Sequence, residues 1–156
     1  RVGNGPFPTE LMDETGDKLR NIGNEFGATT GRNRRCGWFD APVVRKATVV
    51  NGLTHLAITK LDVLDTFDTI KICTHYMCDG EKLDLIPNQL SKVGRCTPVY
   101  EEMPGWKVDT SKCRKFDELP ENAKKYLNRM AELVGVKIGM VSIGAKRDQS
   151  IVVDLD

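Results

Sequence analysis

The clearest pattern of apolar and polar positions lies between Pro120 and Val134. A helix drawn through this segment has one apolar face and one charged or polar face, as in a surface helix that packs on a core. Gly135 follows directly and suits the left-handed cap that ends many helices. We therefore predict a helix over 120–134 whose buried face carries Ala123, Leu127, Met130, Leu133 and Val134.

Two further helices are predicted nearer the N-terminus. Residues 41–53 repeat apolar side chains at helical spacing, with Asp40 placed as the N-cap and Pro42 in the first turn, where its missing N–H is tolerated. Residues 13–22 are expected to form a shorter helix that ends at Gly23.

Short apolar or β-branched runs predict strands between these helices. They cover residues 56–59, 70–76, 82–86, 99–103, 136–143 and 150–155. Turn-forming residues at 78–81 separate the second run from the third, which predicts a β-hairpin. A loop or short strand is expected at 1–10, and loops are expected at 24–37, 106–118 and 144–148. Strands that alternate with helices indicate the α/β class.

Composition narrows the classes of function. A chain of 156 residues is long enough for one compact domain, and 40% hydrophobic and 29% charged residues are ordinary for a globular protein. The net charge of +1 offers no broad basic surface, and no apolar run approaches the ~18 residues of a membrane span. We therefore expect neither nucleic acid nor a membrane as a partner.

Cysteine and histidine usage argues against a metal centre. The five cysteines are odd in number and include no Cys-x-x-Cys pair, which disfavours a disulfide framework or a zinc site and favours a reducing, cytoplasmic location. His55 and His75 are isolated from plausible co-ligands, so packing or surface roles are expected for both.

One loop that follows a predicted strand is suited to guanine. In Thr59-Lys60-Leu61-Asp62, the Asp62 carboxylate can accept paired hydrogen bonds from the ring N–H and the exocyclic amine of guanine. Adenine lacks this pair of donors, so an unpaired carboxylate would penalise adenine binding. The aliphatic stem of Lys60 can cover the base. Taken alone, the signal is weak, since a Lys and an Asp after a strand usually form a solvated turn.

A second loop, Ser142-Ile143-Gly144, also follows a predicted strand. Its backbone N–H groups can meet the guanine oxygen, and Gly144 permits close approach of the backbone. Together the two loops resemble the base-recognition loops of GTP-binding proteins. The chain has no Gly-x-x-x-x-Gly-Lys-Ser/Thr segment, so other groups would have to hold the phosphates.

Residues 28–35, Ala-Thr-Thr-Gly-Arg-Asn-Arg-Arg, form the densest polar cluster, here called the arginine loop. Guanidinium groups bind carboxylate or phosphate through paired, charge-assisted hydrogen bonds, and threonine hydroxyls and N–H groups near Gly31 can complete an anion site. Neighbouring arginines repel one another without an anion, so we expect a mobile loop that becomes ordered on ligand binding. A solvated basic turn explains the composition equally well.

Several long motifs, in order along the chain, resemble the adenylosuccinate synthetase family. The matching segments are Arg1–Gly3 with Gly5–Glu10, Gly23–Arg32 with Arg34–Arg35 and Gly37–Trp38, Thr59–Asp65, Pro98–Trp106, and Ser142–Gly144. The resemblance implies the C-terminal part of a P-loop-NTPase-like, mainly parallel sheet with flanking helices and an added antiparallel hairpin. It also implies that residues 1–156 are the C-terminal fragment of a longer enzyme.

The resemblance implies an activity as well. The family uses GTP, with Mg²⁺, to phosphorylate the 6-oxygen of IMP, and the amine of L-aspartate then displaces the phosphate to give adenylosuccinate, GDP and phosphate. Such enzymes are ligases of AMP biosynthesis and are usually homodimeric and cytoplasmic. The main alternative is a guanine-nucleotide-binding module without catalysis. Another is an interaction domain whose arginine loop docks an acidic partner.

Residue roles follow from the same resemblance. It implies that Ala28, Thr29, Thr30, Gly31, Arg32, Asn33 and Arg34 form an aspartate loop. Arg32 would also approach the IMP ribose, together with the backbone of Val2, and Arg34 would approach the GTP phosphates. The implied guanine contacts are Lys60, Leu61, Asp62, Ser142, Ile143 and Gly144.

The family's catalytic parts are not among these motifs. Its phosphate loop, its catalytic Asp and His, its Mg²⁺ ligands and an arginine lent by a neighbouring subunit all precede the segment that Arg1–Gly3 resembles. We therefore expect no catalytic residue, no metal ligand and no synthetase activity in this chain alone. Asn33 departs from the Arg or Pro common at its position, with little effect expected, and 107–118 matches no part of the pattern.

Overall fold

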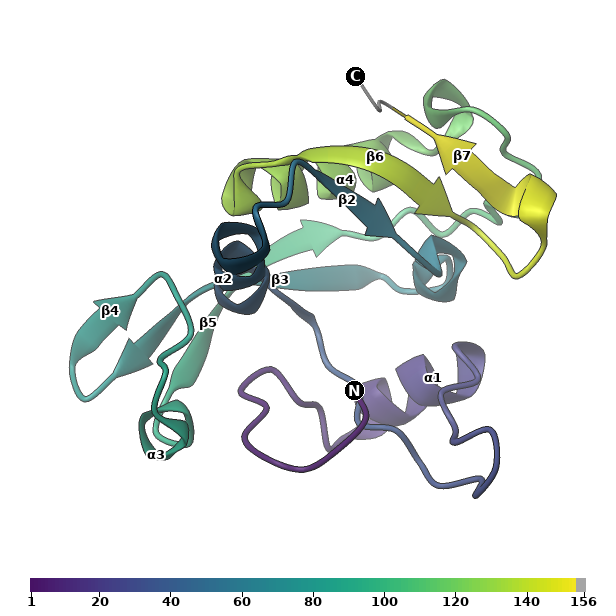
Figure 1. The fold of residues 1–156 in the computed structure, drawn as a ribbon. Coiled ribbons are helices and arrows are strands. Elements are labelled where there is room, and N and C mark those ends of the chain that lie inside the picture. Colours follow the sequence, from purple (N-terminus) through teal and green to yellow (C-terminus); the bar gives the residue numbers. More distant parts are fainter. Residues whose placement is uncertain (154–156) are drawn as a thin grey trace. The chain divides into compact units, whose positions relative to one another are not determined.

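The computed structural model describes residues 1–153, which form a mixed α/β fold (Figure 1). The chain divides into two compact units. The first consists of residues 1–43 and 71–101, and the second consists of residues 44–70 and the chain from Glu102 onward. No helix within the described residues has the length and apolarity needed to cross a membrane.

The sheet that lies mostly in the first unit is built on β3 (Thr69–Cys78). This strand pairs in parallel with β1 (Phe39–Asp40), antiparallel with β4 (Glu81–Leu83), and also with β5 (Thr97–Pro104). The turn between β3 and β4 has positive φ angles of 51° at Asp79 and 84° at Gly80, as two-residue hairpins favour. The predicted hairpin is thus confirmed.

Two helices lie wholly in the first unit. The predicted helix near the N-terminus is confirmed as α1 (Glu14–Ile22), in which Asp13 Oδ1 accepts the N–H of Gly16 at 3.0 Å and Gly23 forms the C-cap. The four-residue α3 (Leu90–Val93) was not predicted, because a single turn is too short to produce a periodic apolar pattern.

Asp40 caps α2 (Ala41–Asn51) as predicted, and its Oδ1 accepts the N–H of Val43 at 3.3 Å. The same buried carboxylate accepts the hydroxyl of Tyr76 at 2.6 Å and lies 3.5 Å from the hydroxyl of Thr9. Burial raises the pKa of Asp40 above its usual range, and these hydrogen bonds offset the rise only in part. Of the three donors, Tyr76 lies closest to the Asp40 carboxylate, whose burial costs free energy unless it is hydrogen-bonded.

Tyr76→Phe is expected to lower the free energy of unfolding by about 1–3 kcal/mol, because it removes this donor from the buried Asp40 carboxylate. Urea denaturation followed by circular dichroism measures the change. Tyr100→Phe removes a half-buried hydroxyl in the same unit and should change stability by less than about 0.5 kcal/mol. Equal losses in the two variants would contradict the assigned role of Tyr76.

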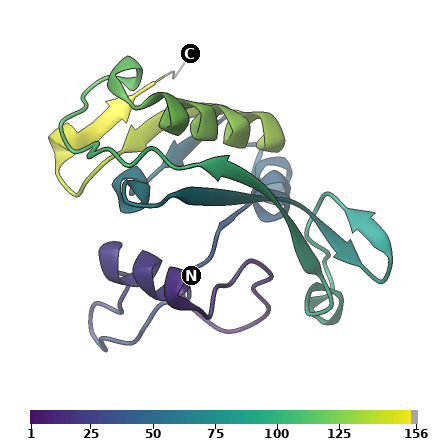
Figure 2. The same ribbon diagram turned by 180° about the vertical axis from the view of Figure 1, so that it is seen from behind.

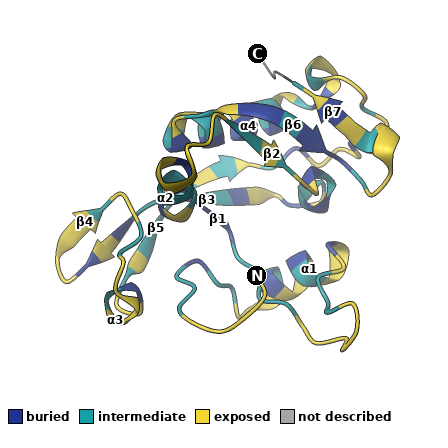
Figure 3. Ribbon diagram, viewed as in Figure 1, coloured by how far each residue is buried: buried dark blue, intermediate teal, exposed yellow. Residues whose placement is uncertain are grey.

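The sheet of the second unit has the order β2 (His55–Ile58), β6 (Lys137–Ser142), β7 (Ser150–Val152). β2 pairs with β6 in parallel and β7 pairs with β6 antiparallel. The central β6 is mostly buried (Figure 3). The predicted strand at 150–155 is confirmed over Ser150–Val152, and its last two residues lie outside the described part of the chain.

Helix α4 (Glu121–Val134) covers one face of this sheet (Figures 1 and 2). Gly135 caps it with a φ of 81°, as predicted. Its buried residues are Ala123, Tyr126, Leu127, Met130 and Val134. Leu133 is only half-buried, whereas Tyr126 was missed and packs 6.1 Å, centroid to centroid, from the ring of Trp106.

The expectation of a surface loop over 106–118 is wrong for its first part. Trp106 and Thr110 are buried, because both donate hydrogen bonds to the carboxylate of Asp65. The indole N–H of Trp106 lies 2.7 Å from Oδ1, and the N–H of Thr110 lies 2.8 Å from Oδ2. Asp65 therefore anchors this segment in the second unit.

Candidate functional site

The arginine loop closes on itself through backbone hydrogen bonds. The N–H of Gly27 donates to the carbonyl of Arg32 at 2.8 Å, and the N–H of Gly31 donates to the carbonyl of Gly27 at 2.9 Å. Gly31 has a φ of 65°, which only glycine adopts readily. A Cβ on Gly27 would lie 2.9 Å from Oγ1 of Thr30, too close for a larger residue without a shift. The conformation of the loop therefore favours glycine at both positions.

The three arginines of the loop have different surroundings. Arg34 pairs with Glu25 at 2.9 Å, while its buried Nε has no hydrogen-bond partner among residues 1–153. Arg35 makes a bidentate pair with Glu10 at 2.8 and 2.6 Å, which holds the pKa of Glu10 below its usual range. Arg32 is exposed, and no carboxylate of the described residues pairs with it. Its charge is the one most available to a ligand.

A hollow of 520 Å³ lies beside the loop, within the first unit. Four of its ten lining residues are arginines and none is acidic. The lining residues are Arg1, Val2, Gly3, Asn4, Gly27, Thr30, Arg32, Asn33, Arg34 and Arg35. Clustered guanidinium groups without carboxylates at the rim make this hollow a site for an anion such as a carboxylate or a phosphate.

The structure brings together, around this hollow, some of the residues that were predicted to bind aspartate or IMP. Five residues of the predicted set line it: Val2, Thr30, Arg32, Asn33 and Arg34. Three do not, and they are exposed in the loop: Ala28, Thr29 and Gly31. Arg35, which the sequence placed in the arginine loop without a ligand contact of its own, also lines the hollow, and its guanidinium pairs with Glu10, 25 positions away in sequence.

The two predicted guanine loops are neighbours in the second unit. They follow the carboxyl ends of β2 and β6, which pair in parallel, so both loops leave the same edge of the sheet. The backbone N–H of Lys60 donates to Oγ of Ser142 at 3.0 Å and joins the two loops directly. Lys60 has a φ of 59°, a conformation that is uncommon outside glycine and that often occurs at functional sites.

Asp62 presents an acceptor without a partner. Its Oδ1 is buried and accepts no hydrogen bond from any described residue. Burial raises the pKa of Asp62 above its usual range, and the negative charge of Asp65 raises it further. A buried acceptor in this state costs free energy, which a ligand carrying suitable donors can recover.

The second loop, Ser142–Gly144, offers fewer free backbone N–H groups to guanine than expected. The N–H of Ile143 already donates to the carbonyl of Gln149 at 2.9 Å. No hydrogen bond among residues 1–153 uses the N–H of Gly144 or Ala145. A Cβ on Gly144 would lie 2.2 Å from the end of the Gln149 side chain, so a larger residue there would require that flexible side chain to move. The side chain of Leu61 is buried, which leaves only its backbone for a ligand.

The described residues do not fit a magnesium site. No group of three or more His, Cys, Asp or Glu side chains within residues 1–153 is arranged to hold a metal ion. The Nδ1 atoms of His55 and His75 lie 3.0 and 2.8 Å from the hydroxyls of the adjacent Thr54 and Thr74.

Comparisons with known proteins identify the family. The family profile described as adenylosuccinate synthetase matches residues 1–151. The chain belongs to the adenylosuccinate synthetase family. The adenylosuccinate synthetase of Trichlorobacter lovleyi is 61% identical over 153 residues, which are 98% of this chain and 36% of that protein. That of Geobacter sulfurreducens is 60% identical over 153 residues, 98% of this chain and 35% of its own length.

A solved structure shares the fold. The fully ligated adenylosuccinate synthetase from Plasmodium falciparum is 40% identical, with a TM-score of 0.94 over 99% of this chain and 37% of that one. This likeness confirms the family and the α/β class that the motifs predicted. The chain spans about 36% of the length of the curated synthetases that it matches.

Proposed function

We propose that this chain supplies aspartate-binding and guanine-binding parts of a GTP-dependent ligase, which joins L-aspartate to IMP and yields adenylosuccinate, GDP and phosphate. The observation that carries the proposal is the hollow lined by four arginines and no acidic residue. L-Aspartate carries two carboxylates, and paired guanidinium groups hold such groups in a fixed orientation. Membership of the adenylosuccinate synthetase family supports this choice of anion.

Within this proposal, Arg32, Arg34 and Thr30 hold the aspartate carboxylates, because their side chains line the hollow. Arg32 also meets the IMP ribose with the backbone of Val2, and Arg34 meets a phosphate. Asn33 also lines the hollow, and the exposed Ala28, Thr29 and Gly31 reach the ligand as the loop moves. Bound in this way, the amine of aspartate is positioned for attack, and such positioning removes much of the entropic cost of a reaction between two molecules.

The guanine part of the proposal rests on the second unit. The buried Oδ1 of Asp62 accepts from the guanine ring N–H, and the stem of Lys60 covers the base. Backbone of Leu61 and of Ser142, Ile143 and Gly144 shapes the edge of the pocket, with the N–H of Gly144 as the donor to the guanine oxygen. These residues bind and orient, and we assign no proton transfer to them.

We further propose GTP with Mg²⁺ as the co-substrate pair, a cytoplasmic location and a homodimer, as the family resemblance implies. Bound Mg²⁺ neutralises phosphate charge in phosphoryl transfer. The side chains of residues 1–153 do not form a site for Mg²⁺.

A chimera tests the proposed function. The chain replaces the aligned stretch of the Trichlorobacter lovleyi enzyme, and adenylosuccinate formation from IMP, GTP and L-aspartate is followed by chromatography. We expect activity within about tenfold of the parent enzyme, because conservative differences outside contacts change stability more than chemistry. Light scattering of the same chimera tests the homodimer.

One result separates the ligase from its main alternative. A folded chimera that binds GDP but forms no adenylosuccinate would favour the non-catalytic guanine-nucleotide-binding module, which the unpaired Oδ1 of Asp62 supports by itself. A folded chimera that binds neither GDP nor aspartate would contradict both.

A further inference from the structure

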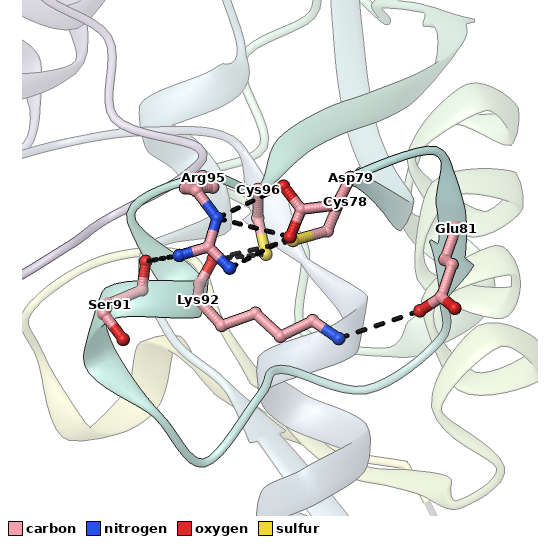
Figure 4. Close-up of polar contacts among 7 residues, drawn as sticks. All are labelled: Cys78, Asp79, Glu81, Ser91, Lys92, Arg95 and Cys96. Atoms are coloured by element: carbon pink, nitrogen blue, oxygen red, sulfur yellow. Dashed lines mark hydrogen bonds and ion pairs between the residues drawn. The ribbon is translucent and has the colours of Figure 1, made fainter.

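Two cysteines face one another in the first unit, away from the residues of the proposed site. Cys78 is the last residue of β3, and Cys96 comes directly before β5, the strand that pairs with β3. Both sulfurs lie within hydrogen-bonding distance of the carbonyl oxygen of Lys92, at 3.7 Å for Cys78 and 3.4 Å for Cys96, and Cys78 lies equally close, at 3.7 Å, to Oδ2 of Asp79. Sharing one acceptor places the two sulfurs side by side (Figure 4).

Ion pairs hold the backbone on either side of this cysteine pair. Arg95 makes a forked pair with Asp79 in the hairpin turn, with nitrogen–oxygen distances of 2.9 to 3.2 Å. Lys92 pairs with Glu81 at 3.7 Å (Figure 4). The turn of the hairpin and the segment around α3, which carry the two cysteines, are therefore joined by ion pairs on both sides of them.

The two thiols differ in accessibility. Cys78 is 1% exposed, whereas Cys96 is half-buried. A small reagent in solution therefore reaches Cys96 first and leaves Cys78 as the inner partner. Each of the other three cysteines donates to a different carbonyl: Cys36 to Arg34, Cys73 to His75 and Cys113 to Glu118.

We propose that Cys78 and Cys96 are a redox modification site, which forms a reversible intramolecular disulfide with a small disulfide oxidant such as oxidised glutathione. The Cys96 thiolate attacks one sulfur of the oxidant, whose S–S bond breaks and releases one thiolate. The Cys78 thiolate then attacks Cys96 Sγ and releases the second. The protein thiols lose two protons and two electrons, and the oxidant gains them as two thiols.

The surroundings set the rate of this reaction. Burial raises the pKa of Cys96 to about 11, and the neighbouring Cys78 thiol adds to the rise, while Lys92 and Arg95 oppose it. Of the charged groups at the pair, Asp79 is neutralised by Arg95 and Glu81 by Lys92. Because the thiolate is scarce at neutral pH, the oxidation rate should rise about tenfold from pH 7 to pH 8.

Thiol titration and intact mass measure the reaction on the purified protein with oxidised glutathione. The number of free thiols should fall by two from the five cysteines, with a loss of about 2 Da, and dithiothreitol should restore both values. Proteolysis should release one peptide pair joined through Cys78 and Cys96. The closed segment should raise the midpoint of thermal unfolding by about 5–10 °C.

Three outcomes would overturn the proposal: five thiols that persist at pH 8, a stable glutathione adduct on Cys96, or a disulfide with a different partner. Cys96→Ser should abolish the loss of two thiols. Cys113→Ser, a replacement in the second unit, should leave it intact. Cys78 is buried and its replacement carries a folding risk, so the test rests on Cys96→Ser and on the unmodified protein.

Discussion

Arg32→Ala is expected to lower kcat/KM for L-aspartate about 10²–10⁴-fold in the chimera, because it removes a forked pair of charge-assisted hydrogen bonds worth roughly 1.5–3 kcal/mol each. Arg34 and Arg35 are already paired with Glu25 and Glu10, whereas Arg32 has no carboxylate partner among the described residues. Its loss therefore removes ligand contacts without leaving an unpaired acidic group behind.

Matched variants separate a ligand contact from a general effect of charge. Arg32→Lys keeps the charge but not the planar fork, so it should recover only a small part of the lost activity. Arg129→Ala breaks an exposed ion pair with Glu132 on α4 and should leave kinetics unchanged. Steady-state rates at varied aspartate, with a thermal melt for each variant, make the comparison. An Arg32→Ala enzyme with an unchanged kcat/KM would remove Arg32 from the aspartate site.

The elements that could be predicted from sequence are those whose signals are local. Helix α4 follows from its apolar face and Gly135, and the hairpin follows from turn residues flanked by β-branched runs. Asp40 as a cap also needs only its immediate neighbours. Each of these features is determined by side chains within a few positions of one another, so periodicity and turn chemistry were enough.

The parts that were missed depend on contacts between distant positions. Trp106 and Thr110 are buried because Asp65, more than forty positions earlier, accepts their hydrogen bonds at 2.7 and 2.8 Å. Arg35 lies in the predicted arginine loop, but its pairing with Glu10, 25 positions earlier, was missed. No local pattern encodes such pairs, since a carboxylate in a loop has the same sequence signature whether it meets solvent or an indole.

The candidate guanine site shows the same division. A strand followed by Thr59-Lys60-Leu61-Asp62 was visible in the sequence, but its joining to Ser142 through the N–H of Lys60 was not. That contact depends on β2 and β6 being parallel neighbours, although 82 positions separate Lys60 from Ser142. The N–H of Ile143 is also not available to guanine, because it donates to the carbonyl of Gln149.

Asp62→Asn is expected to weaken GDP binding to the chimera at least about 100-fold. In the proposed site, the buried Asp62 carboxylate accepts two hydrogen bonds, one from the guanine ring N–H and one from the guanine amine. An asparagine amide has one acceptor and one donor side, so it opposes the guanine amine. Xanthine carries an oxygen in place of that amine. The same variant should therefore bind xanthosine diphosphate more tightly than GDP, which reverses the preference of the unmodified protein.

Asp62→Asn is expected to weaken GDP binding without lowering the stability of the fold. The pKa of Asp62 is raised in the folded state by burial and by the charge of Asp65. A carboxyl group of this kind stabilises the fold when protonated, and that contribution is lost as the pH rises through its folded pKa. At neutral pH the charged group therefore costs stability, and asparagine removes the cost, so Asp62→Asn should unfold at an equal or higher temperature at pH 7.

Calorimetric titration with GDP and xanthosine diphosphate, paired with melts at pH 5 and pH 7, measures both effects. Asp68→Asn is the control, because Asp68 is an exposed partner of Lys107 in the same unit, and nucleotide affinity should not change. A less stable Asp62→Asn protein would assign Asp62 to the fold. A stable one that still prefers GDP would show that another group reads the base. Only lost GDP affinity with retained stability fits an acceptor kept unpaired for a ligand.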